Sequence, residues 1–88
     1  FLFHSMDQAV AAAVEMAWAV PELAAIELID MNTTLMVREF LGLDMEVGIG
    51  IFIEFHAANK VRAESVDLAS QVAVAHEGRQ IKVEDPWR

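Results

Sequence analysis

The stretch Val47–Ala58, V-G-I-G-I-F-I-E-F-H-A-A, decides how the fold is built. Its central part, Ile49–Phe55, is nearly all β-branched or aromatic and lacks proline, which predicts a strand covered on at least one face. Side chains alternate along a strand, so Ile51 and its alternate neighbours share a wholly apolar face. The other face begins apolar and ends in two ionisable side chains, Glu54 and His56. We expect the apolar face to lie in the core.

The segment Met6–Val20 predicts a long helix, because it is rich in Ala, Val and Met and contains neither Gly nor Pro. Ser5 and Gln8 have the spacing of a capping box, and Pro21 ends the helix because it has no backbone N–H to donate. The apolar spacing predicts an inward stripe of Val10, Ala13, Val14, Ala17 and Trp18.

The segment Leu23–Ile29 predicts a second strand. Asp30 or Asn32 could then cap a short helix over Leu35–Leu41, and Gly42 is placed to end it in the left-handed conformation.

A last helix is predicted from Asn59 to about His76, with Gly78 just beyond its end. The inward stripe expected for it is Val61, Ser65, Leu68, Ala69, Val72 and Ala73. The alternation of Arg79–Glu84 predicts an edge strand, which Pro86 ends.

This order of elements predicts an α+β domain of the ferredoxin-like split βαβ type. It would have a four-stranded antiparallel sheet, two long helices on one face and a short helix inserted between the second and third strands. Residues 1–88 are expected to form one domain. The apolar fraction of 56% exceeds the roughly 45–50% of ordinary soluble domains, and Phe1 already lies in a predicted strand. We therefore expect a piece of a longer protein that self-associates through exposed apolar surface.

Charge and composition exclude several classes of function. The net charge of −8 would repel phosphate backbones, so no nucleic-acid partner is expected. No apolar run is long enough to span a bilayer, and the absence of cysteine removes thiolate metal sites and disulfides. The three histidines lack the spacing of a zinc helix, so no metal is expected, and we expect a cytoplasmic location.

Two pairs of polar side chains remain as candidates for chemistry. Glu54 and His56 point the same way from one strand, a pairing that suits proton transfer, although a solvated strand end explains them more simply. Glu27 must be exposed or paired within its apolar strand, and Asp30 is most simply a helix cap. We assign no catalytic or cofactor-binding residue and retain Glu54 and His56 as weak substrate-facing candidates.

Several short motifs together resemble the C-terminal domain of FAD-linked oxidases, most closely the D-lactate dehydrogenase (cytochrome) and glycolate oxidase subunit family. The family pattern has a strand ending E-x-x-D, a strand ending E-F-H before a small residue, a helix ending at a Gly-rich turn, and an acidic D-P. The matching residues here are Phe3, Ser5, Ala9, Val10, Glu27, Asp30, Glu54, Phe55, His56, Glu77, Gly78, Asp85 and Pro86. Ala57 stands where the family usually has Gly, and Trp87 follows the D-P where the family runs on with charged residues.

The resemblance implies that a parent enzyme oxidises a D-2-hydroxy acid to the 2-oxo acid by hydride transfer to FAD. FAD would be bound mainly by another domain of the same chain, and this region would cap the flavin and help to form the substrate pocket. The family's metal-binding histidines and substrate-binding arginine lie beyond the matched region, so the region alone would be inactive and hold no cofactor. Through its parent, the protein could be peripheral at a membrane. The alternative is a free-standing ferredoxin-like module that binds a ligand or a partner.

Overall fold

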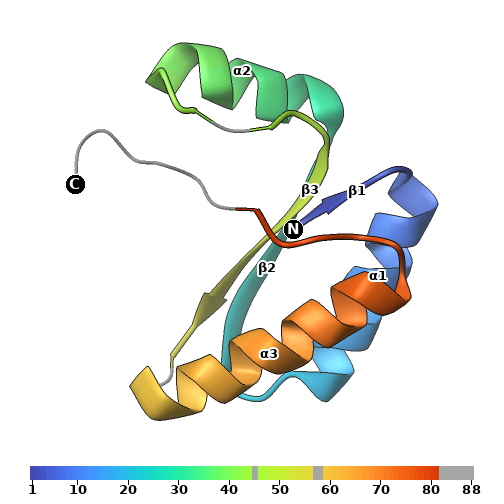
Figure 1. Ribbon diagram of the computed structural model, residues 1–88, viewed down its shortest axis with the longest axis vertical. Helices are drawn as coiled ribbons and strands as arrows, with labels where there is room; N and C mark the ends of the chain where they lie inside the picture. Colours follow the sequence, from blue (N-terminus) through green and yellow to red (C-terminus); the bar gives the residue numbers. More distant parts are fainter. Residues whose placement is uncertain (45, 57–58, 82–88) are drawn as a thin grey trace.

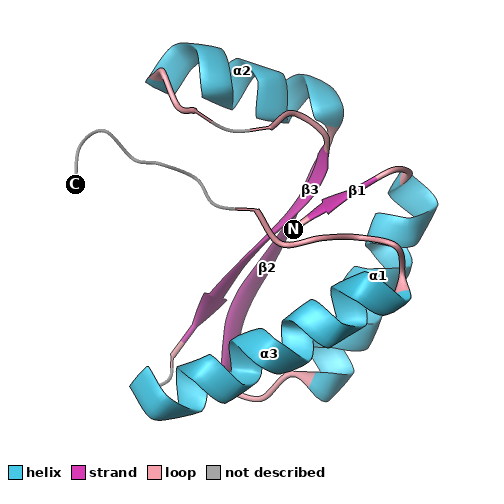
Figure 2. Ribbon diagram, in the orientation of Figure 1, coloured by secondary structure: helices cyan, strands magenta, loops and turns pink. Residues whose placement is uncertain are grey.

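The computed structural model describes residues 1–44, 46–56 and 59–81, and it leaves the side chains of residues 59–62 undescribed. Within these residues the fold is α+β, as Figures 1 and 2 show. The elements in chain order are β1 (Leu2–Phe3), α1 (Met6–Ala19), β2 (Leu23–Ile29), α2 (Met31–Leu41), β3 (Ile49–Phe55) and α3 (Asn59–Ala75).

The sheet is antiparallel, with β3 in the middle and the order β1-β3-β2. Along β2 and β3, Leu28 lies opposite Ile51 and Glu27 lies opposite Phe52. Ile51 is 1% exposed and belongs to the core, as predicted. The core side chains of α1 and α3 pack on the face of the sheet that carries Ile51. Helix α2 lies beyond the end of the sheet at which β2 ends and β3 begins (Figure 1).

The predicted four-stranded ferredoxin-like sheet is not observed, because the described residues form three strands. From the predicted strand over 79–84, only Arg79 pairs, in an isolated antiparallel bridge with Leu2, and residues 82–84 lie outside the described residues. The reason lies in β1. Successive residues of a strand direct their backbone groups to opposite sides. Phe1 bonds to Ile51 of β3, so Leu2 bonds Arg79 on the other side through both its N–H and its carbonyl oxygen.

Helix α1 begins and ends as predicted, but its inward face was predicted wrongly. Ser5 caps it by accepting a hydrogen bond from the Gln8 N–H at 3.2 Å. The buried residues are Ala9, Ala12 and Met16, whereas Trp18 is 88% exposed. Of the other residues in the predicted stripe, Val10, Val14 and Ala17 are exposed and Ala13 packs at the edge of the core.

The small side chains of α1 explain this rotation of the helix. Ala9 and Ala12 share the core with Ala69 and Ala73 of α3, and alanine faces let two helices approach closely. The bulk of Trp18 would hold the helices apart, so it lies outside. In α3, Ser65, Ala69, Val72 and Ala73 are buried as predicted, Leu68 is 37% exposed, and the side chain of Val61 lies outside the described residues.

Helix α2 starts earlier than predicted and is capped by Asp30. The Asp30 carboxylate accepts a hydrogen bond from the Thr33 N–H at 2.7 Å, which holds the pKa of Asp30 below its usual value. Gly42 ends the helix with a φ of 63°, the left-handed conformation that was predicted.

Two residues, Glu77 and Gly78, shape the chain just after α3, whereas the sequence pointed to Gly78 alone. Glu77, and not Gly78, adopts the left-handed conformation, with a φ of 63°. Gly78 is buried under Phe3, and a Cβ atom at this position would overlap the Phe3 ring. The glycine is therefore required by close packing and not by backbone conformation.

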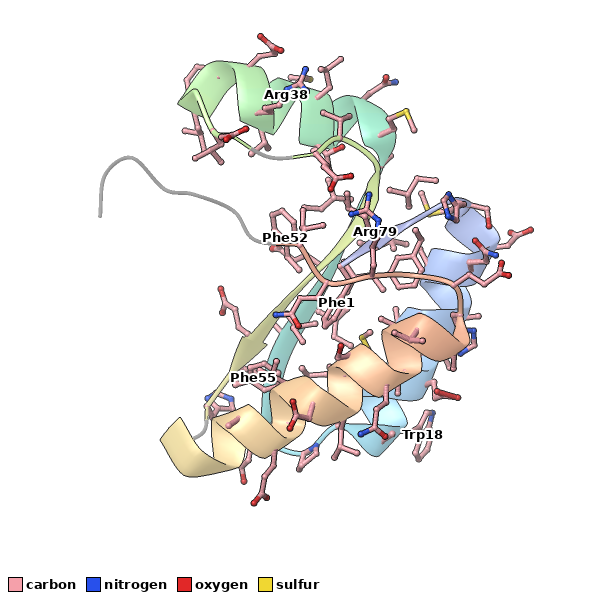
Figure 3. All side chains as sticks on the ribbon, in the orientation of Figure 1. Phe1, Trp18, Arg38, Phe52, Phe55 and Arg79 are labelled. Carbon is pink, nitrogen blue, oxygen red and sulfur yellow. The ribbon has the colours of Figure 1, made fainter. Side chains whose placement is uncertain are left out.

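An ion pair ties the segment after α3 to the loop before β3. Arg79 donates from Nη1 to Glu46 Oε1 at 2.7 Å and from Nη2 to Glu46 Oε2. These hydrogen bonds hold the pKa of Glu46 below its usual value and raise the pKa of Arg79. Figure 3 places Arg79 near the middle of the molecule.

We expect Gly78→Ala to lower the free energy of unfolding by about 1–3 kcal/mol, because the added methyl group overpacks the Phe3 ring. Gly48→Ala is the matched control, since its Cβ would lie 3.5 Å from Leu2 Cδ2, an ordinary contact. Urea denaturation measures both variants. Equal losses for the two would contradict the role given to Phe3.

We expect the Glu46–Arg79 pair to stabilise the fold above the ordinary carboxyl pKa and to lose this effect as pH falls through the lowered pKa of Glu46. In Arg79→Gln, the pKa of Glu46 should rise towards its ordinary value. Arg38→Gln is the control, because Arg38 pairs with Glu39 at 3.0 Å and not with Glu46. Carboxyl NMR titration checks this, and an unchanged Glu46 titration in Arg79→Gln would refute the pairing.

Candidate functional site

Glu54 and His56, the two residues predicted for a site, both lie at the C-terminal end of β3, but only one of them lines a cavity. Glu54 lies within β3, opposite Ala25 of β2, and is exposed. His56 follows the strand, is also exposed, and its backbone N–H donates to the Glu22 carbonyl oxygen at 3.0 Å. Only Glu54 reaches the cavity described below.

The second predicted pair separates in the structure. Asp30 is the cap of α2, as its position suggested. Glu27 is exposed and lies opposite Phe52, on the same face of the sheet as Glu54. Glu27 and Glu54 are therefore diagonal neighbours across β2 and β3, within reach of one ligand. This face is opposite to the face that carries Ile51, on which α1 and α3 pack.

A cavity of about 540 Å³ runs along the edge of β3 that faces away from β2. This volume falls within the usual range of small-molecule sites, roughly 300–1,000 Å³. Its lining is mainly apolar, with Glu54 and Gln80 as the polar side chains. Figure 3 labels three of its aromatic residues, which lie beside β3 in the order Phe52, Phe1 and Phe55. The other lining residues are Val37, Leu41, Leu43, Ile51, Ile53, Val66 and Ile81.

Helix α2 forms one wall of this cavity, and a buried threonine holds the helix in place. Thr34 has no exposed surface, and its hydroxyl lies 2.6 Å from the Gly48 carbonyl oxygen and 2.9 Å from the Met31 carbonyl oxygen. The hydroxyl also accepts a hydrogen bond from the Gly48 N–H at 3.2 Å. Leaving such buried backbone groups unpaired costs about 1–3 kcal/mol. This role of Thr34 leaves no sign in the sequence, since N-T-T after Asp30 indicates only a helix cap.

A second buried hydroxyl fixes α3 against the turn that precedes β2. Ser65 is fully buried, and its hydroxyl donates to the Pro21 carbonyl oxygen at 2.9 Å. Glu22, the residue after Pro21, adopts a φ of 59°, which is uncommon for a residue with a side chain. Glu22 also accepts the hydrogen bond from His56, so this turn sets the position of the end of β3.

Polar side chains also gather at the opposite end of the sheet. Gln8 of α1 donates to the Glu77 carboxylate, and His76 Nε2 lies 3.7 Å from Glu15 Oε1. His4 lines a smaller cavity of about 170 Å³ in this region. These groups connect α1 to the end of α3.

The described residues do not fit the phosphates of a dinucleotide. The described cationic side chains are Arg38 and Arg79, and each is paired with a glutamate. The G-I-G sequence at Gly48–Gly50 leads into β3 and not into a helix, so it forms no phosphate-binding loop. Over the described part of the chain, no three His, Cys, Asp or Glu side chains could hold a metal ion.

None of the described helices is both long enough and apolar enough to cross a membrane.

Comparison with known proteins gives one match. The family model for the C-terminal domain of FAD-linked oxidases matches residues 1–85. No curated protein and no solved structure matches the chain. The family match spans nearly the whole chain and includes both E-L-I-D, at the end of β2, and E-F-H, at the end of β3. Membership implies an FAD-linked oxidoreductase as the parent enzyme, with its FAD-binding domain in the same chain. The chain belongs to the family of FAD-linked oxidase C-terminal domains.

Proposed function

We propose that the chain forms part of the cap and substrate domain of an FAD-dependent D-2-hydroxyacid dehydrogenase, of the D-lactate or glycolate type. The parent enzyme would oxidise the 2-hydroxy acid to the 2-oxo acid, with the C2 hydrogen leaving as hydride to the flavin and the hydroxyl proton leaving to a base. Family membership supports the FAD-linked oxidoreductase, and the motifs quoted from the sequence support the narrower substrate class.

The observation that carries the proposal is the pairing of the two motif strands. β2 ends in E-L-I-D and β3 ends in E-F-H, and the two strands are hydrogen-bonded neighbours. Their glutamates, Glu27 and Glu54, share the face of the sheet away from the core. A face with two carboxylates beside Phe52 suits contact with the hydroxyl end of a substrate and with a second domain. We place Glu54 towards the substrate, with exposed His56 as its partner in proton transfer.

Electrostatics determines what the rest of the parent enzyme must provide. A 2-hydroxy acid is an anion, and a chain of net charge −8 with glutamates on this face repels it. Arg38 and Arg79, the described cationic side chains, are each paired with a glutamate, so we expect the cations for the substrate carboxylate and the FAD phosphates to come from outside the described residues. The chain by itself is proposed to be inactive, cytoplasmic and, through its parent, peripheral at a membrane.

We also propose that the complete domain has the four-stranded ferredoxin-like sheet. In that arrangement the last strand lies beside the first, at the edge away from the third. The Leu2–Arg79 bridge supports this strand order, because Arg79 pairs with β1 on the side away from β3.

In the parent enzyme, we expect Glu54→Gln to lower kcat/KM for D-lactate or glycolate by about 100-fold, since positioned proton transfer contributes roughly 10²–10⁴-fold. Flavin content, measured by absorbance, should not change, because FAD is bound elsewhere. Glu64→Gln is the matched control on the exposed side of α3.

Anaerobic mixing with the hydroxy acid tests the reaction itself and should bleach the flavin absorbance. A flavin that stays oxidised with both D-lactate and glycolate rules out the substrate class. A parent chain that binds no flavin rules out the enzyme assignment and favours the free-standing module.

We expect the isolated chain to self-associate, because large apolar side chains remain exposed. Phe40 of α2 is 89% exposed, Met36 is 68% exposed and Trp18 of α1 is 88% exposed. Added salt should favour the larger species by screening the net charge of −8. Light scattering after size exclusion measures the mass, and the double variant Phe40→Ser, Trp18→Ser should shift it towards the monomer. A monomeric mass at every concentration and salt level contradicts this prediction.

A further inference from the structure

Helix α1 is apolar on two sides, and one of them lies in the core. The core side consists of Ala9, Ala12 and Met16. On the exposed side, an apolar residue recurs at every fourth position, and we call these four residues the α1 ridge: Met6, Val10, Val14 and Trp18. With 3.6 residues per turn, this spacing forms one continuous ridge that winds slowly away from the core. The exposed fraction therefore rises from 37% at Met6 to 88% at Trp18.

The polar side chains of α1 lie beside the ridge and not between its members. Three of the fourteen residues are polar, namely Asp7, Gln8 and Glu15. Gln8 donates to the carboxylate of Glu77, and Glu15 Oε1 lies 3.7 Å from His76 Nε2, so both side chains face the end of α3. A helix that is apolar nearly all round is normally buried on every side. The ridge therefore has the character of a contact surface.

Figure 3 shows Trp18, the last member of the ridge, at the edge of the molecule, where it projects away from β2 and β3. Tryptophan and methionine are enriched at the centres of protein interfaces, and charged residues are depleted there. The α1 ridge has this composition.

Electrostatics favours this face for contact between two copies of the chain. Each copy has a net charge of −8, so two copies repel except where charged side chains are few. Between Asp7 and Glu22 the single charged residue is Glu15, which is turned towards His76. The exposed apolar side chains of α2, in contrast, adjoin a charged pair of the same helix. The α1 ridge is thus the apolar surface on which like-charged copies can approach each other.

The order of side-chain sizes along the ridge suits a two-fold axis. A two-fold interface uses the same patch on both copies, so every contact occurs twice. When two α1 helices lie antiparallel with the axis between Val10 and Val14, each Val10 faces Val14 of the second copy. Each Met6 then faces Trp18 of the second copy, a favourable sulfur–aromatic contact. The antiparallel arrangement also places opposite ends of the two helix dipoles side by side.

We propose that the α1 ridge binds a second copy of this chain, with the two α1 helices packed antiparallel across a two-fold axis between Val10 and Val14. The two copies of Trp18 bury roughly 300–500 Å² together, since one tryptophan buries about 150–250 Å². The smaller ridge residues add less, so the interface stays below the roughly 1,200 Å² of a stable complex. The dimer is therefore weak and separates on dilution. This inference depends neither on the substrate nor on the flavin chemistry proposed above.

Disulfide trapping tests the register, because the chain contains no cysteine and each introduced thiol is then unique. Isotope-labelled Val10→Cys is mixed with unlabelled Val14→Cys under mild oxidation, and the label identifies the mixed dimer by its mass. The mixed disulfide should form about tenfold faster than the disulfide of either variant alone, because only the mixed pair is face to face. Two Val10→Cys thiols are offset by about 6 Å along the helix axis, which puts them beyond disulfide reach.

Val74→Cys is the matched control, since Val74 is an exposed valine of α3 that lies outside the ridge. Mixed with Val10→Cys, it should give no more disulfide than either variant alone. Sedimentation equilibrium measures the affinity without oxidation. Val14→Ser should raise the dissociation constant by about tenfold or more, because it removes a valine from both sides of the interface, and Val74→Ser should leave the constant unchanged. Circular dichroism checks that each variant keeps its helices.

Four outcomes would overturn the proposal. The unsubstituted chain could remain a monomer at every concentration, or the mixture could form disulfide no faster than the single variants. The fastest disulfide could come from Val10→Cys alone, which would indicate parallel helices. Equal weakening by Val14→Ser and Val74→Ser would assign the contact to another face. None of these measurements involves flavin, so their failure leaves the proposed enzyme function standing, and a parent enzyme that does not reduce its flavin leaves the dimer standing.

Discussion

The backbone of β3 is the constraint on which the rest of this structure depends. Its residues pair with β2 on one edge from Gly50 to Phe55, and with β1 on the other edge as far as Ile51. Ile51 also provides the most completely buried side chain of the strand, in the core with Met16. Because one strand organises both ladders and the core, the positions of α1 and α3 follow from it.

Burial of small residues explains both the core and the exposed surface. Alanines of α1 and α3 meet inside beside Met16, and Val10, Val14 and Trp18 of α1 are turned away from the core. Trp18 and Phe40 then lie on two different helices, each almost fully exposed. Exposed apolar surface of this extent marks contact sites in soluble proteins. It agrees with a domain whose family functions beside a flavin-binding domain.

The face of the sheet that carries the glutamates and the edge of β3 differ in polarity. Glu27 and Glu54 lie on the face away from the core, where both are exposed. The cavity along the edge of β3 is lined mainly by apolar side chains, among them Phe1, Phe52 and Phe55. Glu54 belongs to both surfaces, because it also lines this cavity.

The sequence by itself determined the local structure. The caps Ser5 and Asp30, the stop at Gly42, the three helices and the strands over 23–29 and 49–55 follow from short-range chemistry, which every residue carries with it. It also placed Ile51 in the core and led to the family, because motif spacing survives in the chain. Glu54 was found as a candidate for the same reason.

Only the tertiary structure decided which side of α1 faces inward. The stripe ending at Trp18 has helical spacing, but alanine packing between α1 and α3 outweighs its hydrophobicity. Likewise, the roles of Thr34 and Gly78 depend on Gly48 and Phe3, which are distant in sequence. Within the described part of the predicted fourth strand, Arg79 alone pairs, because Leu2 is the residue of β1 whose backbone groups face that side. Long-range partners of this kind leave no periodic signal in the sequence, since they are fixed only when the elements pack.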